Sequence, residues 1–103
     1  MIRVEYKCDR NSHELTVEGH AGYSECGNDI VCSAMSAISY ALVGYLENTD
    51  SRYICESMEC GFLELSCPKG TESDVAFKMA IIGYLQIEKQ YPRNVEVILP
   101  TWG

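Results

Sequence analysis

The chain contains 103 residues, of which 47% are hydrophobic and 22% charged, a balance that is typical of one globular domain and excludes a long disordered chain. Its 15 acidic and 8 basic side chains give a formal net charge of −7. This charge disfavours direct binding to the phosphates of nucleic acids and favours a basic polypeptide as partner. No apolar run approaches the roughly 20 residues of a membrane helix, and the N-terminus alternates apolar and polar residues instead of forming the apolar core of a signal peptide. We therefore expect a soluble, cytoplasmic protein without a membrane partner.

The six cysteines would predict a disulfide framework in a secreted chain. In the cytoplasm they are expected to stay as thiols, and we interpret most of them as small core residues. Cys55, Cys60 and Cys67 are spaced unlike the paired C-x2-C ligands of structural zinc sites, so no metal is expected. Zinc-dependent folding through these three thiols stays open as an alternative. The sequence has no phosphate-binding glycine loop, no dinucleotide-binding glycine pattern and no HExxH motif, and no cofactor is expected.

Two antiparallel strands are expected at the start of the chain, because apolar and polar residues alternate over 2–8 and again over 14–18. His13 lies at the start of the hairpin, just before its second strand, where we expect it to be solvated. The second strand ends at His20. Residues 21–28 then show no periodicity, which indicates a loop.

A first helix is expected from Asn28-Asp29, both good N-caps, to about Leu46. One face of this helix is apolar, so it should lie on a core. The apolar face consists of Val31, Ala34, Met35, Ile38, Leu42 and Tyr45.

A second helix is expected over 72–90, because Thr71 and Asp74 have the spacing of a capping box and Pro92 follows the helix end. This helix is apolar over most of its circumference. Such a pattern favours burial on more than one side, and therefore a homodimer in which the partner subunit covers part of the helix.

The remaining elements are a hairpin over 51–57 and 61–67, with Leu63 and Leu65 facing inward, and a last short strand over 95–99. The order of elements is then ββαββαβ. This order predicts a single α+β domain over the whole chain, 1–103, built as a mainly antiparallel sheet with two helices on one face.

The candidate chemistry centres on Cys32, about three residues inside the first helix. Unpaired N–H groups and the positive end of the helix dipole favour a thiolate at such a position. On the helical projection Cys32 falls at the border between the core face and the solvent face, where it can be partly exposed. Position alone leaves the alternative that Cys32 fills a gap in the core.

His20 offers a proton carrier for this thiol, because it ends a strand just before the loop that leads to Cys32. Its side chain is expected to point away from the buried face; the alternative is an ordinary surface histidine. Asp29 has two readings, as the N-cap of the helix or as the group that orients His20. Ser36, one turn after Cys32, could hydrogen-bond the site. N–H groups at the helix start are expected to hold an oxyanion.

Gly19-His20-Ala21 followed by Asp29-Ile30-Val31-Cys32 and Ser36 resembles the motif of the Prp family of bacterial ribosomal-processing cysteine proteases, and the resemblance covers nearly the whole chain. It implies a cysteine endopeptidase with Cys32 as nucleophile and His20 as proton donor. It places Gly19, Asp29 and Ser36 in supporting positions, and it also implies a homodimer. The chain departs from the family at residues 33–35, where it has Ser-Ala-Met in place of small aliphatic residues.

The resemblance further implies a substrate, the N-terminal extension of large-subunit ribosomal protein 27, which is removed near an aromatic pair. An acidic enzyme suits a basic ribosomal protein. The alternative function is a non-catalytic module that binds a basic ribosomal-protein segment, with Cys32 and His20 shaping a pocket. Rapid, pH-dependent alkylation of Cys32 over the other cysteines would favour the enzyme.

Overall fold

A computed structural model describes residues 1–25, 28–49, 52–59 and 61–100. Its elements follow the expected ββαββαβ order. They are β1 (Ile2–Cys8), β2 (Ser12–Glu18), α1 (Ile30–Glu47), β3 (Ile54–Glu59), β4 (Phe62–Pro68), α2 (Thr71–Gln90) and β5 (Val95–Ile98). Strand β3 lies further along the chain than the expected 51–57, and its pairing with β4 is irregular between Cys55 and Ser57.

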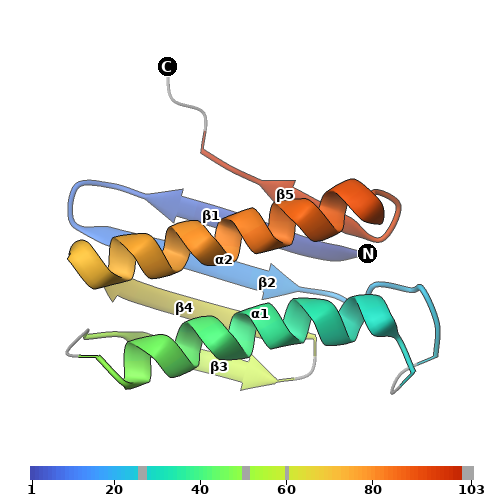
Figure 1. Cartoon of the computed structure of the whole chain (residues 1–103), viewed down its shortest axis with the longest axis horizontal. Helices are drawn as coiled ribbons and strands as arrows, with labels where there is room; N and C mark the ends of the chain where they lie inside the picture. The colour runs from blue at the N-terminus through green and yellow to red at the C-terminus, as the bar shows by residue number, and fades with distance from the viewer. Residues whose placement is uncertain (26–27, 50–51, 60, 101–103) are drawn as a thin grey trace.

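The five strands form one sheet in the order β3-β4-β2-β1-β5. Every neighbouring pair is antiparallel except β1 with β5, which is parallel. Both helices cover the same face of the sheet, so the expected α+β architecture is confirmed (Figure 1). The end of β2, the start of α1, the β3–β4 turn and the α2–β5 turn all lie at one end of the sheet (Figure 1).

The core lies between the sheet and the two helices, where alternate strand residues meet the apolar helix faces. Leu63 and Leu65 are buried as expected, whereas Tyr45 is 44% exposed and does not belong to the core. The helix instead buries Ser39, whose hydroxyl donates to the carbonyl of Met35 at 3.0 Å and lies 2.7 Å from the hydroxyl of Tyr84 on α2. The largest fully buried side chains are Tyr84, Phe77, Leu15, Met35, Leu46, Val4, Val31, Val95 and Cys67.

By length and composition alone α1 could cross a membrane, since its 18 residues have a mean hydropathy of 1.4. The expectation that no segment approaches this length is therefore wrong. In the folded chain α1 packs Val31, Met35, Leu42 and Leu46 against the sheet and α2. Its apolar character is explained by this packing.

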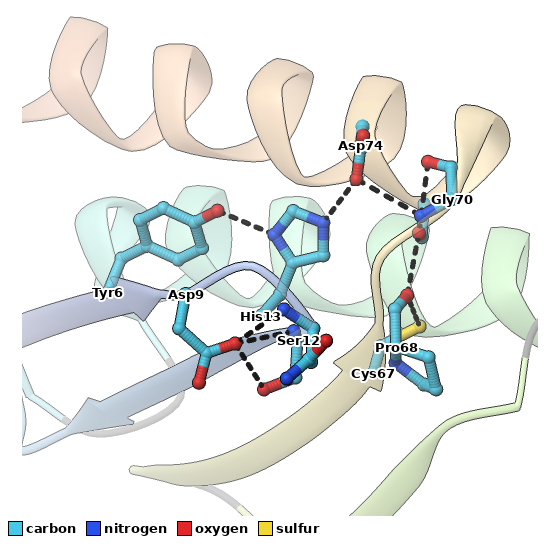
Figure 2. Close-up of polar contacts among 10 residues, drawn as sticks. Tyr6, Asp9, Ser12, His13, Cys67, Pro68, Gly70 and Asp74 are labelled. Atoms are coloured by element: carbon cyan, nitrogen blue, oxygen red, sulfur yellow. Dashed lines mark hydrogen bonds and ion pairs between the residues drawn. The ribbon is translucent and has the colours of Figure 1, made fainter.

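His13 is buried, with 3% of its surface exposed, so the expectation of a solvated side chain is wrong. The alternation of Leu15 and Val17 extends back to His13, because β2 starts at Ser12 and His13 pairs with both neighbouring strands. Its Nδ1 lies 2.6 Å from the Tyr6 hydroxyl and its Nε2 lies 2.7 Å from the Asp74 carboxylate (Figure 2). Its ring also stacks on Phe77, with centroids 4.4 Å apart. The imidazole thus ties β1, β2 and α2 together, at the end of the sheet opposite the β3–β4 turn.

The capping box expected at the start of α2 forms only in part. The N-cap is Gly70, which makes no side-chain cap bond, and Thr71 is already inside the helix. Asp74 supplies the reciprocal contact, because its Oδ1 accepts the N–H of Gly70 at 3.2 Å (Figure 2). The bond from His13 first, and then the bond from Gly70, hold the pKa of the Asp74 carboxyl below its ordinary value.

Candidate active site

Cys32 lies in the first turn of α1, half-buried, as its position on the helical projection predicts. Its sulfur faces the segment that follows β2. The backbone N–H of Ala21 donates to Sγ at 3.3 Å. The segment directly after β2 therefore passes beside the thiol and presents a hydrogen-bond donor to it.

Asp29 is the N-cap of α1, and its carboxylate is buried, with 4% of the residue exposed. Its Oδ1 accepts from the N–H groups of Val31 at 2.9 Å and Cys32 at 3.0 Å. Its Oδ2 accepts from the N–H groups of Tyr23 at 3.0 Å and Ser24 at 3.1 Å. Burial by itself would raise the pKa of Asp29, but these backbone donors bring the pKa below its ordinary value. Of the two readings, the structure shows the cap, and it adds a second role in holding the loop.

The sequence predicts that N–H groups at the helix start bind an oxyanion, but in the structure these donors are already engaged. The donors of Val31 and Cys32 are bound to the Asp29 carboxylate, and the N–H of Ser33 donates to the Asp29 carbonyl at 3.0 Å. An acidic N-cap satisfies the same orphan donors that an oxyanion would need. That part of the expectation is wrong for the free protein.

His20 is exposed and projects from the end of β2, as predicted. Its imidazole lies against Gly61 in the β3–β4 turn: a Cβ on Gly61 would be 2.8 Å from Cε1 and 3.0 Å from Nε2. The N–H of Gly19 donates to the Gly61 carbonyl at 2.9 Å, which holds the two segments together. Gly19 has φ +103°, and a Cβ there would collide with the carbonyl oxygen of Met1, so only glycine fits.

His20 and Cys32 line one small cavity, together with Gly19 and Ser36. The structure therefore brings four of the five predicted site residues to one place, while Asp29 contacts the main chain of Cys32 beside it. The walls of the cavity are mainly apolar. Its other lining residues are Ile2, Val17, Met35, Ser39, Tyr40, Met58, Gly61, Phe62 and Leu63.

Two residues at this end of the sheet contribute to the site but were not predicted from the sequence. Gly61 leaves room for the His20 ring, and the sequence signals it only as a glycine in a hairpin turn. Asn94 lies in the α2–β5 turn, and its side-chain amide donates to the carbonyl of Ala21 at 2.9 Å. Nothing in the sequence pattern links Asn94 to a segment 73 residues away.

The thiols Cys8, Cys32 and Cys67 form no disulfide. The zinc alternative depends on Cys60, which lies outside the described residues. Within the described ranges, no group of three or more His, Cys, Asp or Glu side chains is arranged to hold a metal ion.

Comparisons with known proteins identify the family and the fold. Residues 1–96 match the family described as cysteine protease Prp. The chain is 30% identical over 84 residues to the ribosomal processing cysteine protease Prp of Mycoplasma pneumoniae, covering 81% of this chain and 83% of that protein. Its fold is similar to a crystal structure of the ribosomal processing protease Prp from S. aureus with a covalently linked product peptide, at a TM-score of 0.82 and 22% identity, covering 97% of this chain and 100% of the other. It is also similar to SMU.848 from Streptococcus mutans, at a TM-score of 0.64 and 28% identity, covering 99% and 96%.

Proposed function

Because the chain belongs to the Prp family of cysteine proteases, we propose that Cys32 is its nucleophile and His20 its proton carrier. The observation that carries this proposal is the shared cavity, which both the His20 imidazole and the Cys32 thiol line, with a backbone N–H donating to the sulfur. The family decides between the two functions left open by the sequence in favour of the protease.

In the acylation step, the Cys32 thiolate attacks the scissile carbonyl carbon, a C–S bond forms, and the carbonyl oxygen becomes an oxyanion. The Ala21 N–H donates to the sulfur at 3.3 Å and stabilises the thiolate before the attack. Collapse of the oxyanion breaks the C–N bond. The His20 imidazolium transfers its proton to the departing amine, leaving a thioester and a neutral imidazole.

In the deacylation step, His20 takes a proton from water, whose oxygen attacks the thioester carbonyl. The C–S bond breaks, and the thiolate leaves as the carboxylic acid product forms and ionises. The imidazolium and the thiolate are then restored. Since His20 is exposed at the rim of the cavity, water can reach it once the amine has left.

We propose as substrate the N-terminal extension of large-subunit ribosomal protein 27, cleaved near an aromatic pair. The name of the Mycoplasma pneumoniae relative, ribosomal processing cysteine protease, supports a ribosomal substrate. The net charge of −7 favours a basic protein. The apolar residues Met58 and Phe62, which line the same cavity as Cys32, offer contacts for aromatic side chains. We place this reaction in the cytoplasm.

We also propose that the protein works as a homodimer. Three apolar residues one helical turn apart on α2 are exposed to solvent: Val75 by 58%, Met79 by 72% and Ile82 by 49%. A stripe of this kind is typical of a surface that a partner covers. Sedimentation at micromolar concentration should give twice the 11.5 kDa chain mass, and Met79→Lys should shift the protein to monomer; a wild-type monomer would remove this proposal.

The test of the chemistry is mass spectrometry of the purified protein mixed with the extended ribosomal protein. Cys32→Ala should abolish cleavage and lower the free energy of unfolding by no more than about 1–2 kcal/mol, because a half-buried sulfur leaves only a small cavity. His20→Ala should also suppress turnover strongly. Cys8→Ser, at the other end of β1, is the matched control and should keep wild-type cleavage. A folded Cys32→Ala protein that cuts at the wild-type rate would refute the assignment.

A further inference from the structure

We infer that Asn94 is a positioning residue that fixes the main chain of Ala21 so that its N–H group stays directed at the sulfur of Cys32. This inference rests on the proposed role of Cys32 as nucleophile. It goes beyond that role by assigning a function to the α2–β5 turn, which lies far from the motif in the sequence.

The sheet topology brings Asn94 to this place. Strand β5 pairs parallel with β1, with Val95 opposite Ile2, so the residue before β5 lies beside the start of β1. The N–H of Ile2 donates to the Asn94 carbonyl at 2.9 Å. Strand β2 runs antiparallel to β1, so the last residue of β2 lies beside the start of β1, at the same end of the sheet and three residues before Ala21.

The contacts engage both polar groups of the Ala21 backbone. Its carbonyl accepts the Asn94 side-chain amide at 2.9 Å, and its N–H donates to Cys32 Sγ at 3.3 Å. Ala21 is 2% exposed, so water has little access to compete for either group. The N–H and the carbonyl belong to the peptide units on either side of the Ala21 Cα, so the two bonds together restrain the φ and ψ angles of Ala21, and losing the Asn94 bond releases one of the two restraints.

The same turn makes a second contact with the loop. The ring of Tyr91 packs edge-to-face against the ring of Tyr23, with centroids 5.4 Å apart and an interplanar angle of 81°. From the opposite side, Asp29 binds the N–H of Tyr23. The start of the loop is thus held between α1 and the α2–β5 turn, and the contact of Asn94 with Ala21 belongs to a built arrangement.

The chemical consequence follows from the difference between a thiol and a thiolate as acceptors. A thiolate accepts an N–H bond more strongly than a neutral thiol, so a fixed donor favours the reactive form. The other ionisable groups around the sulfur are His20 and Tyr40, which line the cavity, and Asp29, which is bound to the Cys32 N–H. Asn94→Ala and Asn94→Asp leave all three in place and remove the amide donor. Because Asn94→Asp also adds a negative charge beside the Ala21 carbonyl, Asn94→Ala is the decisive variant.

The experiment measures alkylation of each cysteine against pH by mass spectrometry, in the full-length protein. In Asn94→Ala and Asn94→Asp, Cys32 should react about threefold to tenfold more slowly at neutral pH, and the midpoint of its pH profile should move upward. Cleavage should lose kcat by a similar factor with little change in KM. Arg93→Ala, an exposed neighbour in the same turn, should match the wild type. Cys8 and Cys67 are internal references, since a loosened fold would speed labelling of the buried Cys67.

An unchanged Cys32 profile in both Asn94 variants would overturn the inference, and so would faster Cys67 labelling as the sole effect. Neither result would affect the proposed dyad, which fails if Cys32→Ala or His20→Ala retains wild-type cleavage. A slower Cys32 reaction with unchanged Cys67 labelling supports the positioning role.

Discussion

Replacing Gly61 by alanine should separate the position of the imidazole from the stability of the fold. A Cβ at this residue would lie 2.8 Å from Cε1 of His20 and 3.0 Å from Nε2. Ordinary contacts begin at 3.4 Å, so the ring must retreat from 2.8 Å to at least that distance. His20 is exposed and can rotate, and we therefore expect the ring to move and the fold to survive.

The expected magnitudes differ for stability and catalysis. The backbone of Gly61 has φ +83°, where a side chain costs about 1–2 kcal/mol of folding free energy. A displacement of a catalytic group by a large part of an ångström costs up to about 100-fold in rate. We expect kcat/KM for a peptide spanning the extension to fall about 10-fold to 100-fold, as measured on protein shown to be folded by denaturant titration.

Gly22→Ala is the matched control for Gly61→Ala. Gly22 also has a positive φ, +69°, but a Cβ there would have no atom within 4 Å. Gly22→Ala should lower the free energy of unfolding by a similar amount and leave His20 in place. Equal kcat/KM values for the two variants would refute the idea that Gly61 holds the ring in position.

Three further outcomes are expected. The pKa of Asp29 lies below its ordinary value of about 4, so the ionised carboxylate stabilises the fold above about pH 4, and this stabilisation is lost as the pH falls through the folded pKa. Asp29→Asn should therefore be less stable at neutral pH, and its stability should depend less on pH in the acid range. Identical acid unfolding transitions of the variant and the wild type would contradict this. Burial raises the pKa of Tyr84 to about 12, above its unfolded value of about 10, so about 3 kcal/mol of stability should be lost as the pH rises from about 10 to about 12. Tyr84→Phe should show a flatter stability profile over that range in denaturant titrations, and an equally steep loss would exclude this cause. His13→Ala should lower the free energy of unfolding by about 2–4 kcal/mol. Because His13 lies far from the cavity, kcat/KM of the folded fraction should stay within about twofold of the wild type. A large catalytic loss would place His13 in the site.

The parts of the site that could be predicted from sequence are those with local signals. Cys32 is marked by the start of an amphipathic helix, and His20 by the end of an alternating strand next to a glycine-containing loop. Asp29 is recognisable as a cap for the same reason. The element order follows from the two periodicities, which is why the fold class and most helix and strand bounds are confirmed.

The parts that could not be predicted depend on which strands become neighbours. Gly61 meets His20 because β4 pairs with β2, and Asn94 meets Ala21 because β5 pairs in parallel with β1. These pairings are long-range, and no local pattern encodes them. The prediction for His13 is wrong for a different reason. A histidine at the start of a hairpin strand predicts a solvated side chain, but His13 occupies an inward position of β2, where Tyr6 and Asp74 satisfy its ring nitrogens.

The parallel pairing of β5 with β1 also determines when the site can exist during biosynthesis. The first strand lies inside the sheet and keeps one edge open until the last strand is added. Synthesis proceeds from the N-terminus, so the segment that carries His20 and Cys32 leaves the ribosome long before Asn94 does. The contact of Asn94 with Ala21 closes a loop of 73 residues, which makes it a slow and late event in folding. The thiol therefore gains its complete surroundings only after Asn94 has been synthesised and β5 has paired, and a nascent chain that ends before Asn94 carries a cysteine whose neighbouring N–H is not yet held.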